Sequence, residues 1–231
     1  MDQLYEIITF DCYGTLIDWE RGLRDGFAAA AAASGRPVDT TAAMRLFRET
    51  EPVVQAETFR SYRDILAETG RRVAVGLGWP LPAARAGFLA ESMLGWTPFP
   101  DTNVSLRRLA GAGYRLGILS NVDDDLLAWT RRHFAAPFDL IVTAEQVRSY
   151  KPAPGHFLEA RTRIKGRPWL HAAQSYFHDV TPCRALGIPC AWINRKSQAP
   201  GGAARPDREF RTLAELADWL VPVPAHDGSS V

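Results

Sequence analysis

Short strand patterns that alternate with helical stretches constrain the fold of this chain more than any other feature. The strand patterns are rich in β-branched and aromatic residues, end at polar or turn residues, and lie at 5–10, 114–119, 138–143, 174–177 and 190–193. Helical stretches at 106–110, 125–133 and 156–164 separate most of them. This alternation predicts an α/β fold with a Rossmann-like parallel sheet that carries helices on both faces.

One long stretch departs from this alternation. From residue 18 to 97 no strand pattern is convincing, and helical patterns occur at 22–33, 41–51, 57–68 and 83–94. We therefore expect an α/β core made of residues 1–17 and 98–221, with a helical cap of residues 18–97 inserted after the first strand. Residues 222–231 are rich in Pro, Gly and Ser and predict a disordered tail.

Charge and cysteine usage exclude several classes of function. A net charge of +1 gives no electrostatic basis for binding nucleic acid or an anionic membrane. The three cysteines have no CxxC spacing, which argues against a zinc site or a disulfide framework and fits a reducing cytoplasm. The chain begins without a signal-peptide pattern and contains no apolar run of the ~18 residues that a membrane span needs. These features predict a soluble, cytoplasmic protein.

Polar clusters follow four of the predicted strands. Asp11 follows the first strand, Ser120 and Asn121 follow the second, Lys151 lies after the third, and His178 and Asp179 follow the fourth. Each alone is ordinary, because such residues commonly form turns, helix caps or solvated surface charges. Ligands of parallel sheets bind at the carboxyl ends of the strands, so the joint placement predicts an active site there.

These clusters also carry a family resemblance. The segment from Asp11 to Leu16 reads DCYGTL, and it is followed by Ser120-Asn121, by Ser149-Tyr150-Lys151-Pro152 and by Asp179. In order and spacing they resemble the four motifs of the haloacid dehalogenase superfamily, and the resemblance spans about residues 5–195. It implies a hydrolase whose nucleophile is Asp11.

The resemblance implies roles for five catalytic residues. The Asp11 carboxylate would attack the substrate and form a covalent ester that water then hydrolyses. Lys151 beside it would lower its pKa, and Thr15 would donate a hydrogen bond to it. Ser120 and neighbouring backbone amides would bind an anionic group of the substrate, and Asp179 would position the water or bind a metal.

Two departures from phosphatases of this superfamily favour carbon–halogen cleavage. Phosphatases usually carry a second Asp two residues after the nucleophile, to protonate an alcohol leaving group. Here that position is Tyr13, and a halide needs no proton. Magnesium is commonly held by a second acid after the last motif, but residues 180–184 contain none. The alternative is a magnesium-dependent phosphatase of small metabolites, with Mg²⁺ held by Asp11, the Tyr13 backbone and Asp179; a non-catalytic binding protein is a third, disfavoured reading.

The specific similarity is to L-2-haloacid dehalogenases, which act on short 2-haloalkanoic acids without a cofactor. The DCYGTL segment and the strand at 189–195 match theirs. The resemblance implies a substrate and halide pocket made of Tyr13, Arg48, Phe59, Asn121, Tyr176 and His178. It expects a small-molecule haloacid as partner and allows a homodimer.

Several of these pocket residues have plainer alternatives. Arg48 lies in a charged helical segment, so an exposed surface position is an equal alternative, and Phe59 is as well explained by the core of the cap. His178 can line the pocket, handle the proton of the hydrolytic water or start a helix. Gln174 and Tyr176 replace the Ser and Asn of the family, which predicts an altered environment for the water.

Overall fold

The computed structural model describes residues 3–222 and contains one six-stranded parallel sheet. The strands are β1 (Ile7–Phe10), β2 (Arg115–Ser120), β3 (Leu140–Thr143), β4 (Trp169–Ala173), β5 (Cys190–Ile193) and β6 (Arg208–Phe210). Their order is β3-β2-β1-β4-β5-β6, so the direction of winding reverses next to β1. This is the doubly wound arrangement in which ligands bind at the carboxyl ends of the central strands.

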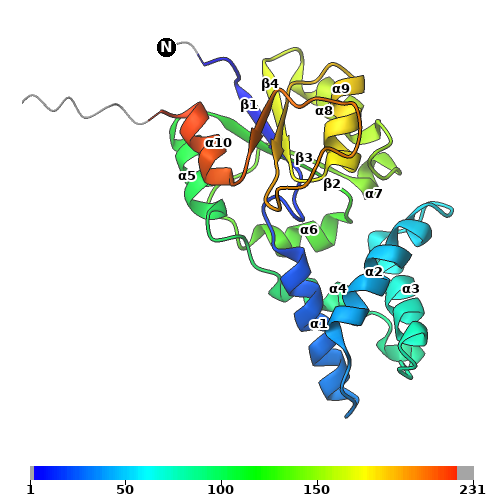
Figure 1. Cartoon of the computed structure of the whole chain (residues 1–231). Coiled ribbons are helices and arrows are strands. Elements are labelled where there is room, and N and C mark those ends of the chain that lie inside the picture. The colour runs from blue at the N-terminus through cyan, green and yellow to red at the C-terminus, as the bar shows by residue number, and fades with distance from the viewer. Residues whose placement is uncertain (1–2, 223–231) are drawn as a thin grey trace, which may run out of the picture.

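Helices cover both faces of the sheet (Figure 1). Helices α5 (Thr102–Gly111) and α10 (Leu213–Leu220) pack on one face, where Ile8 and Phe10 point. Helices α7 (Ala144–Val147), α8 (Gly155–Ile164) and α9 (Thr181–Ala185) lie on the other face, where Ile7 points. Successive side chains of β1 are thus buried on opposite faces of the sheet, as expected for a strand that helices cover on both faces. The predicted α/β fold class is confirmed.

Between β1 and β2 the chain forms a layer of helices, which we call the cap helices. They are α1 (Trp19–Ala33), α2 (Thr40–Gln55), α3 (Tyr62–Gly76), η1 (Ala83–Arg85), α4 (Phe88–Ser92) and η2 (Met93–Gly95). Asp18, Asp39 and Ser61 cap the first three with side-chain oxygens. Buried Phe27, Phe47 and similar side chains join these helices to α6 (Asp124–Arg131) of the core, which lies next to them in Figure 1.

Two sets of hydrogen bonds hold the cap helices on the core, one between backbone groups and one from backbone N–H groups to a side chain. The outgoing and returning chains run side by side, because Asp18 N donates to Thr97 O and Phe99 N donates to Leu16 O, each at 3.0 Å. The carboxylate of Asp123, in the loop after β2, accepts the backbone N–H groups of Tyr62 at 2.8 Å and of Arg63 at 2.9 Å. A core side chain therefore satisfies two N–H groups that the first turn of α3 cannot satisfy internally.

Several observed elements differ from the sequence-based expectation. The helix expected at 57–68 is Tyr62–Gly76, and the one expected at 83–94 is broken into η1, α4 and η2. The fourth strand is Trp169–Ala173 and not 174–177, because the buried polar His171 interrupts its apolar pattern, whereas Tyr176–Val180 forms the π-helical turn η3. Strand β6 was missed because it is short, polar and at the edge of the sheet. Helix α10 was missed as well. The predicted tail lies, from residue 223 on, outside the described residues, and within them no helix is long and apolar enough to cross a membrane.

Candidate active site

The carboxyl ends of β1 to β4 bring the predicted catalytic residues together. Asp11 directly follows β1, Ser120 ends β2, Lys151 lies in the loop after α7, and Asp179 lies in η3 after β4. Lys151 and Asp179 are almost completely buried, and Asp11 keeps 8% of its surface exposed. The sequence positions of these residues span most of the chain, so only the sheet topology assembles them.

Lys151 links the two aspartates. Its Nζ donates to Asp11 Oδ1 at 2.9 Å, to Asp179 Oδ1 at 2.6 Å and to the backbone oxygen of Leu119 at 2.9 Å. An ammonium has three N–H groups, so all of its donors are used. Lys151 therefore orients the two carboxylates and has no donor left for a substrate.

The two carboxylates differ in their pKa. Burial raises the pKa of Asp11, and repulsion from Asp179 adds to that rise, while Lys151 and Thr15 only partly offset it. Burial also opposes ionisation of Asp179, but Lys151 and the hydrogen bond from His171 outweigh it and hold the pKa of Asp179 below its usual range. The expectation that Lys151 lowers the pKa of Asp11 is thus right for that contact and wrong for the net shift. Asp179 is the firmly ionised member, and Asp11 is the more basic of the two carboxylates.

The second oxygen of Asp11 is held by the turn that follows β1. Thr15 Oγ1 donates to Asp11 Oδ2 at 2.9 Å and accepts from the backbone N–H of Gln174 at 2.8 Å. Gly14 in this turn has a φ of +97°, and a Cβ there would lie 3.1 Å from Gln174 Oε1 and 3.2 Å from Trp19 Nε1. Both the left-handed backbone and the close approach require glycine.

A buried hydrogen-bond chain behind Asp179 was not predicted from the sequence. Trp169 Nε1 donates to Thr9 Oγ1 at 2.6 Å, Thr9 Oγ1 lies 2.9 Å from His171 Nδ1, and His171 Nε2 lies 3.0 Å from Asp179 Oδ1. Because the indole can only donate, the Thr9 hydroxyl is free to donate to Nδ1, which leaves the proton on Nε2 to reach Asp179. The one signal in the sequence is a histidine inside an otherwise apolar strand.

Ser120 and Asn121 serve different purposes at the end of β2. Ser120 Oγ is buried and has no hydrogen-bond partner among the described residues, so it is available to a ligand. The Asn121 side chain instead pairs with the backbone of Lys151: Lys151 N donates to Oδ1 at 2.7 Å, and Nδ2 donates to Lys151 O at 3.0 Å. Asn121 therefore fixes the loop that carries the lysine.

Asp11 opens into a cavity of about 270 Å³ between the sheet and the cap helices. From the core it is lined by Asp11, Tyr13, Ser120, Asn121, Lys151, Gln174, Ser175, His178 and Asp179, and from the cap helices and the residue after them by Trp19, Phe47, Glu51, Gln55, Tyr62 and Trp96. Burial, before other causes, raises the pKa of Tyr13 far above its usual value, and the Tyr13 hydroxyl is hydrogen-bonded to Thr130. This cavity is of a size for a small molecule held against Asp11.

Comparison with known proteins identifies the family. The profile of haloacid dehalogenase-like hydrolases matches residues 5–170, well over half of the chain. The chain belongs to the haloacid dehalogenase-like hydrolase family. Two proteins of Pseudomonas putida named (S)-2-haloacid dehalogenase are 29% and 28% identical to it, and the alignments cover 95% and 93% of this chain and 99% and 96% of theirs.

Solved structures agree with this placement. A defluorinating L-2-haloacid dehalogenase is 25% identical, with a TM-score of 0.81 and coverage of 94% of this chain and 95% of that one. The L-2-haloacid dehalogenase of Xanthobacter autotrophicus with chloropropionic acid covalently bound is 19% identical, with a TM-score of 0.79 and coverage of 94% and 98%. At that identity the second likeness shows the fold alone.

Three of the residues predicted to bind substrate in this hydrolase line the Asp11 cavity: Tyr13, Asn121 and His178. Burial, assisted by the positive charge of Lys151, lowers the pKa of His178, so its ring is neutral at pH 7. Its Nδ1 lies 3.0 Å from Ser175 Oγ, the oxygen that also caps the start of η3. His178 is both a pocket-lining residue and a member of a helix start.

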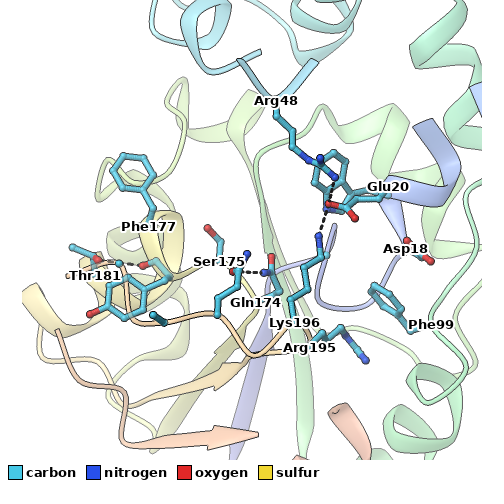
Figure 2. A pocket seen from close by; sticks show the side chains of 16 residues that line it. Asp18, Glu20, Arg48, Phe99, Gln174, Ser175, Phe177, Thr181, Arg195 and Lys196 are labelled. Carbon is cyan, nitrogen blue, oxygen red and sulfur yellow. Dashed lines mark hydrogen bonds and ion pairs between the residues drawn. The ribbon is translucent and has the colours of Figure 1, made fainter. Parts of the chain in front are cut away.

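The other three predicted pocket residues, Arg48, Phe59 and Tyr176, do not line the Asp11 cavity in this structure. Arg48 NH2 donates to Glu20 Oε1 at 2.8 Å and lines a neighbouring groove of about 880 Å³, not the nucleophile's cavity (Figure 2). Its partner Glu20 belongs to α1 and lines the same groove. Lys196 pairs with the same carboxylate from the core.

Phe59 and Tyr176 are held by other contacts. The ring of Phe59 stacks on Tyr150, with centroids 5.3 Å apart, and the Arg148 guanidinium lies 4.7 Å above it. Tyr176 turns its hydroxyl towards the loop before β6, where it donates to Gly202 O at 2.9 Å. Neither is among the residues that line the Asp11 cavity.

The donor set fits a metal ion poorly. The two carboxylates that a magnesium ion would need, Asp11 and Asp179, already bracket the Lys151 ammonium at 2.9 Å and 2.6 Å. Within residues 3–222 no group of three or more His, Cys, Asp or Glu side chains gathers at one point. Hard divalent cations prefer several oxygen ligands, and this site offers them to a lysine instead.

Proposed function

We propose that this hydrolase dehalogenates short 2-haloalkanoic acids, converting them to 2-hydroxy acids through an ester on Asp11. The observation that carries the proposal is an Asp11 carboxylate fixed by Lys151 and Thr15 at the mouth of a small cavity. Two residues after Asp11, where phosphatases usually carry the acid that protonates an alcohol leaving group, this chain has Tyr13, whose hydroxyl is engaged with Thr130. The names of the relatives support the same reaction.

The first step is a displacement at carbon. An oxygen of Asp11 attacks C2 of the haloacid from the side opposite the halogen; the C–O bond forms, and the halide leaves with the electron pair of the C–X bond. The unpartnered Ser120 hydroxyl and the backbone amides around it are the donors for the substrate carboxylate, since Lys151 has none to spare. Attack from behind the halogen inverts the configuration at C2.

The second step is hydrolysis of the ester. Asp179 Oδ2 is buried without a partner among the described residues, so it is the free acceptor that orients the attacking water. Because its pKa is low, Asp179 is better suited to accept a hydrogen bond from the water than to take a proton from it as a general base. Water attacks the carbonyl carbon of the Asp11 ester, and the bond between that carbon and the ester oxygen breaks. One proton of the water ends on the product hydroxyl and the other is released to solvent, so the Asp11 carboxylate is regenerated and the hydroxy acid leaves. Neither step requires a metal or an organic cofactor.

One assay pair tests this function against magnesium-dependent phosphatase activity. Purified protein is incubated with 2-chloropropionate or p-nitrophenyl phosphate, each with Mg²⁺ or EDTA. We expect halide release that resists EDTA, is abolished in Asp11→Asn and is unchanged in Asp25→Asn, an exposed position on α1. Phosphate release that requires magnesium, without halide release, contradicts the proposal.

Oxygen labelling tests the intermediate. A single turnover in H₂¹⁸O should place ¹⁸O in the peptide that contains Asp11 and leave the product hydroxyl unlabelled, because the product oxygen comes from Asp11. Label in the product alone after one turnover indicates direct attack by water and excludes the ester.

We also propose a cytoplasmic location, supported by three buried cysteines that are all free thiols. A homodimer rests on the family resemblance, and sedimentation of the purified protein tests it.

A further inference from the structure

The geometry of displacement assigns the two sides of the cavity to two parts of the substrate. The attacking oxygen, C2 and the halogen must lie nearly in line, so the halogen points away from Asp11. The core side holds Asp11 and its supports, and the opposite side is lined by the cap helices. The departing halide therefore meets the cap side.

The cap side of the cavity contains one charged residue, and it is a carboxyl. Phe47, Glu51 and Gln55 lie at intervals of four on one face of α2 and line the cavity together, with Tyr62 of α3 beside them. Gln55 Nε2 donates to Glu51 Oε1 at 3.1 Å. Within residues 3–222 no cation lies within ion-pair distance of Glu51, and the arginine nearest to it in sequence on α2, Arg48, pairs with Glu20.

Burial favours the neutral form of Glu51, and no cation among the described residues offsets it. Tyr62 of α3 and Tyr150 of the loop before Lys151 both feel its charge, with Asp123 behind them. Across the cavity lie Asp11, Lys151, His178 and Asp179, of which only Lys151 is positive and already committed to both aspartates. Burial with no compensating cation raises the pKa of Glu51 to about 7.

We propose that Glu51 in its protonated form donates the hydrogen bond that receives the departing halide on the cap side of the cavity. The inference rests on the proposed function. Protonated Glu51 donates through the hydroxyl of its carboxylic acid while Gln55 is bonded to the other oxygen. The halide takes the electron pair of the C–X bond and accepts this hydrogen bond; no proton is transferred, and Glu51 is unchanged after the halide diffuses away.

An ionised Glu51 would have the opposite effect, because it would place a second negative charge beside the forming halide. Binding of a halide should therefore weaken as pH rises through 7. For a ligand that binds only the protonated form of a group with a pKa of about 7, the dissociation constant rises about tenfold between pH 6 and pH 8.

Bromide binding measures this without turnover. Sodium bromide is titrated into the wild-type protein at constant ionic strength, and saturable quenching of tryptophan fluorescence is followed, since Trp19 and Trp96 line the cavity. We expect binding about tenfold weaker at pH 8 than at pH 6 in the wild type. In Glu51→Gln the amide keeps a donor but cannot titrate, so its bromide affinity should be independent of pH. Glu49→Gln, exposed two residues away and paired with Arg45, should behave as the wild type.

Turnover supplies the second arm. The kcat/KM for 2-chloropropionate should fall above pH 7 in the wild type and Glu49→Gln, and that fall should be absent in Glu51→Gln. Bromide affinity that is equal at pH 6 and 8, or the same pH dependence in Glu51→Gln, overturns the role of Glu51 even where halide release is normal. If bromide affinity depends on pH as expected but no halide is released from 2-chloropropionate, the proposed function is wrong while Glu51 is still supported as a halide-binding residue.

Discussion

Replacing Lys151 with methionine tests the charge arrangement at the centre of the site. Methionine has a similar length but no charge, so the replacement leaves two buried carboxylates facing each other. The cluster of Asp11, Lys151 and Asp179 carries a net charge of −1 in the wild type and −2 in the variant. Three hydrogen bonds from Nζ disappear, including the one to Leu119 O.

The expected cost follows from burial. Lys151 is 1% exposed and Asp179 fully buried, so water cannot replace the lost cation. Removing one partner of a buried ion pair typically costs about 3–5 kcal/mol, and we expect a loss of that size in the free energy of unfolding at pH 7. The pKa of both carboxyls rises in the variant, so the folded state gains a proton as pH falls. The loss should therefore shrink at pH 5 and be largest at pH 8.

Urea unfolding followed by tryptophan fluorescence at pH 5, 7 and 8 measures these values. Lys165→Met changes an exposed lysine in the same way and serves as the control. The double variant Lys151→Met with Asp179→Asn returns the cluster to −1 and should recover part of the stability, but not the halide release. A Lys151→Met protein as stable as the wild type at pH 7, or one equally destabilised at all three pH values, would refute this reasoning.

Three further predictions concern other parts of the site. His171→Phe removes one of the two donors to Asp179 Oδ1; we expect kcat to fall about tenfold to a hundredfold, from ~1.5–3 kcal/mol of lost charged hydrogen bonding, with KM nearly unchanged. Steady-state kinetics measure this, and a change in KM alone would contradict it. Gly14→Ala should lower the free energy of unfolding by about 1–3 kcal/mol and reduce halide release, since the left-handed φ and the contact with Gln174 both oppose a Cβ; urea unfolding tests it. Arg48→Ala should keep kcat/KM within about twofold, because Arg48 forms a surface ion pair with Glu20 and does not line the Asp11 cavity. A hundredfold loss of kcat/KM would instead place Arg48 in the halide site.

The core of the site could be predicted because its residues lie at the ends of strands. In a parallel sheet the carboxyl ends lie along one edge, so the order of the strand patterns and the positions of Asp11, Lys151 and Asp179 were sufficient to bring them together. The fourth strand was predicted at 174–177, five residues too late in the sequence. The position of Asp179 was still predicted correctly, because η3 directly follows β4 and keeps this residue at the end of the strand.

The cap side could not be predicted in the same way. Which face of α2 looks into the cavity depends on how the cap helices pack against one another. Arg48 and Glu51 lie only about 60° apart around the helix, so helical spacing cannot separate them. The ion pair between Arg48 and Glu20 of α1 separates them in the folded chain. Long-range partners of this kind leave no local mark in the sequence.

The capping of α3 by Asp123 has a consequence for how this protein can be dissected. Because the first turn of α3 takes two of its acceptors from a loop of the sheet, the cap helices lose two backbone hydrogen bonds when they are separated from the core. A chimaera that grafts these helices onto another hydrolase of the family must carry an acceptor at the position of Asp123, or α3 will begin with unsatisfied amides. The same two hydrogen bonds must break whenever the first turn of α3 moves away from that loop, so one core carboxylate ties the start of this helix to the sheet.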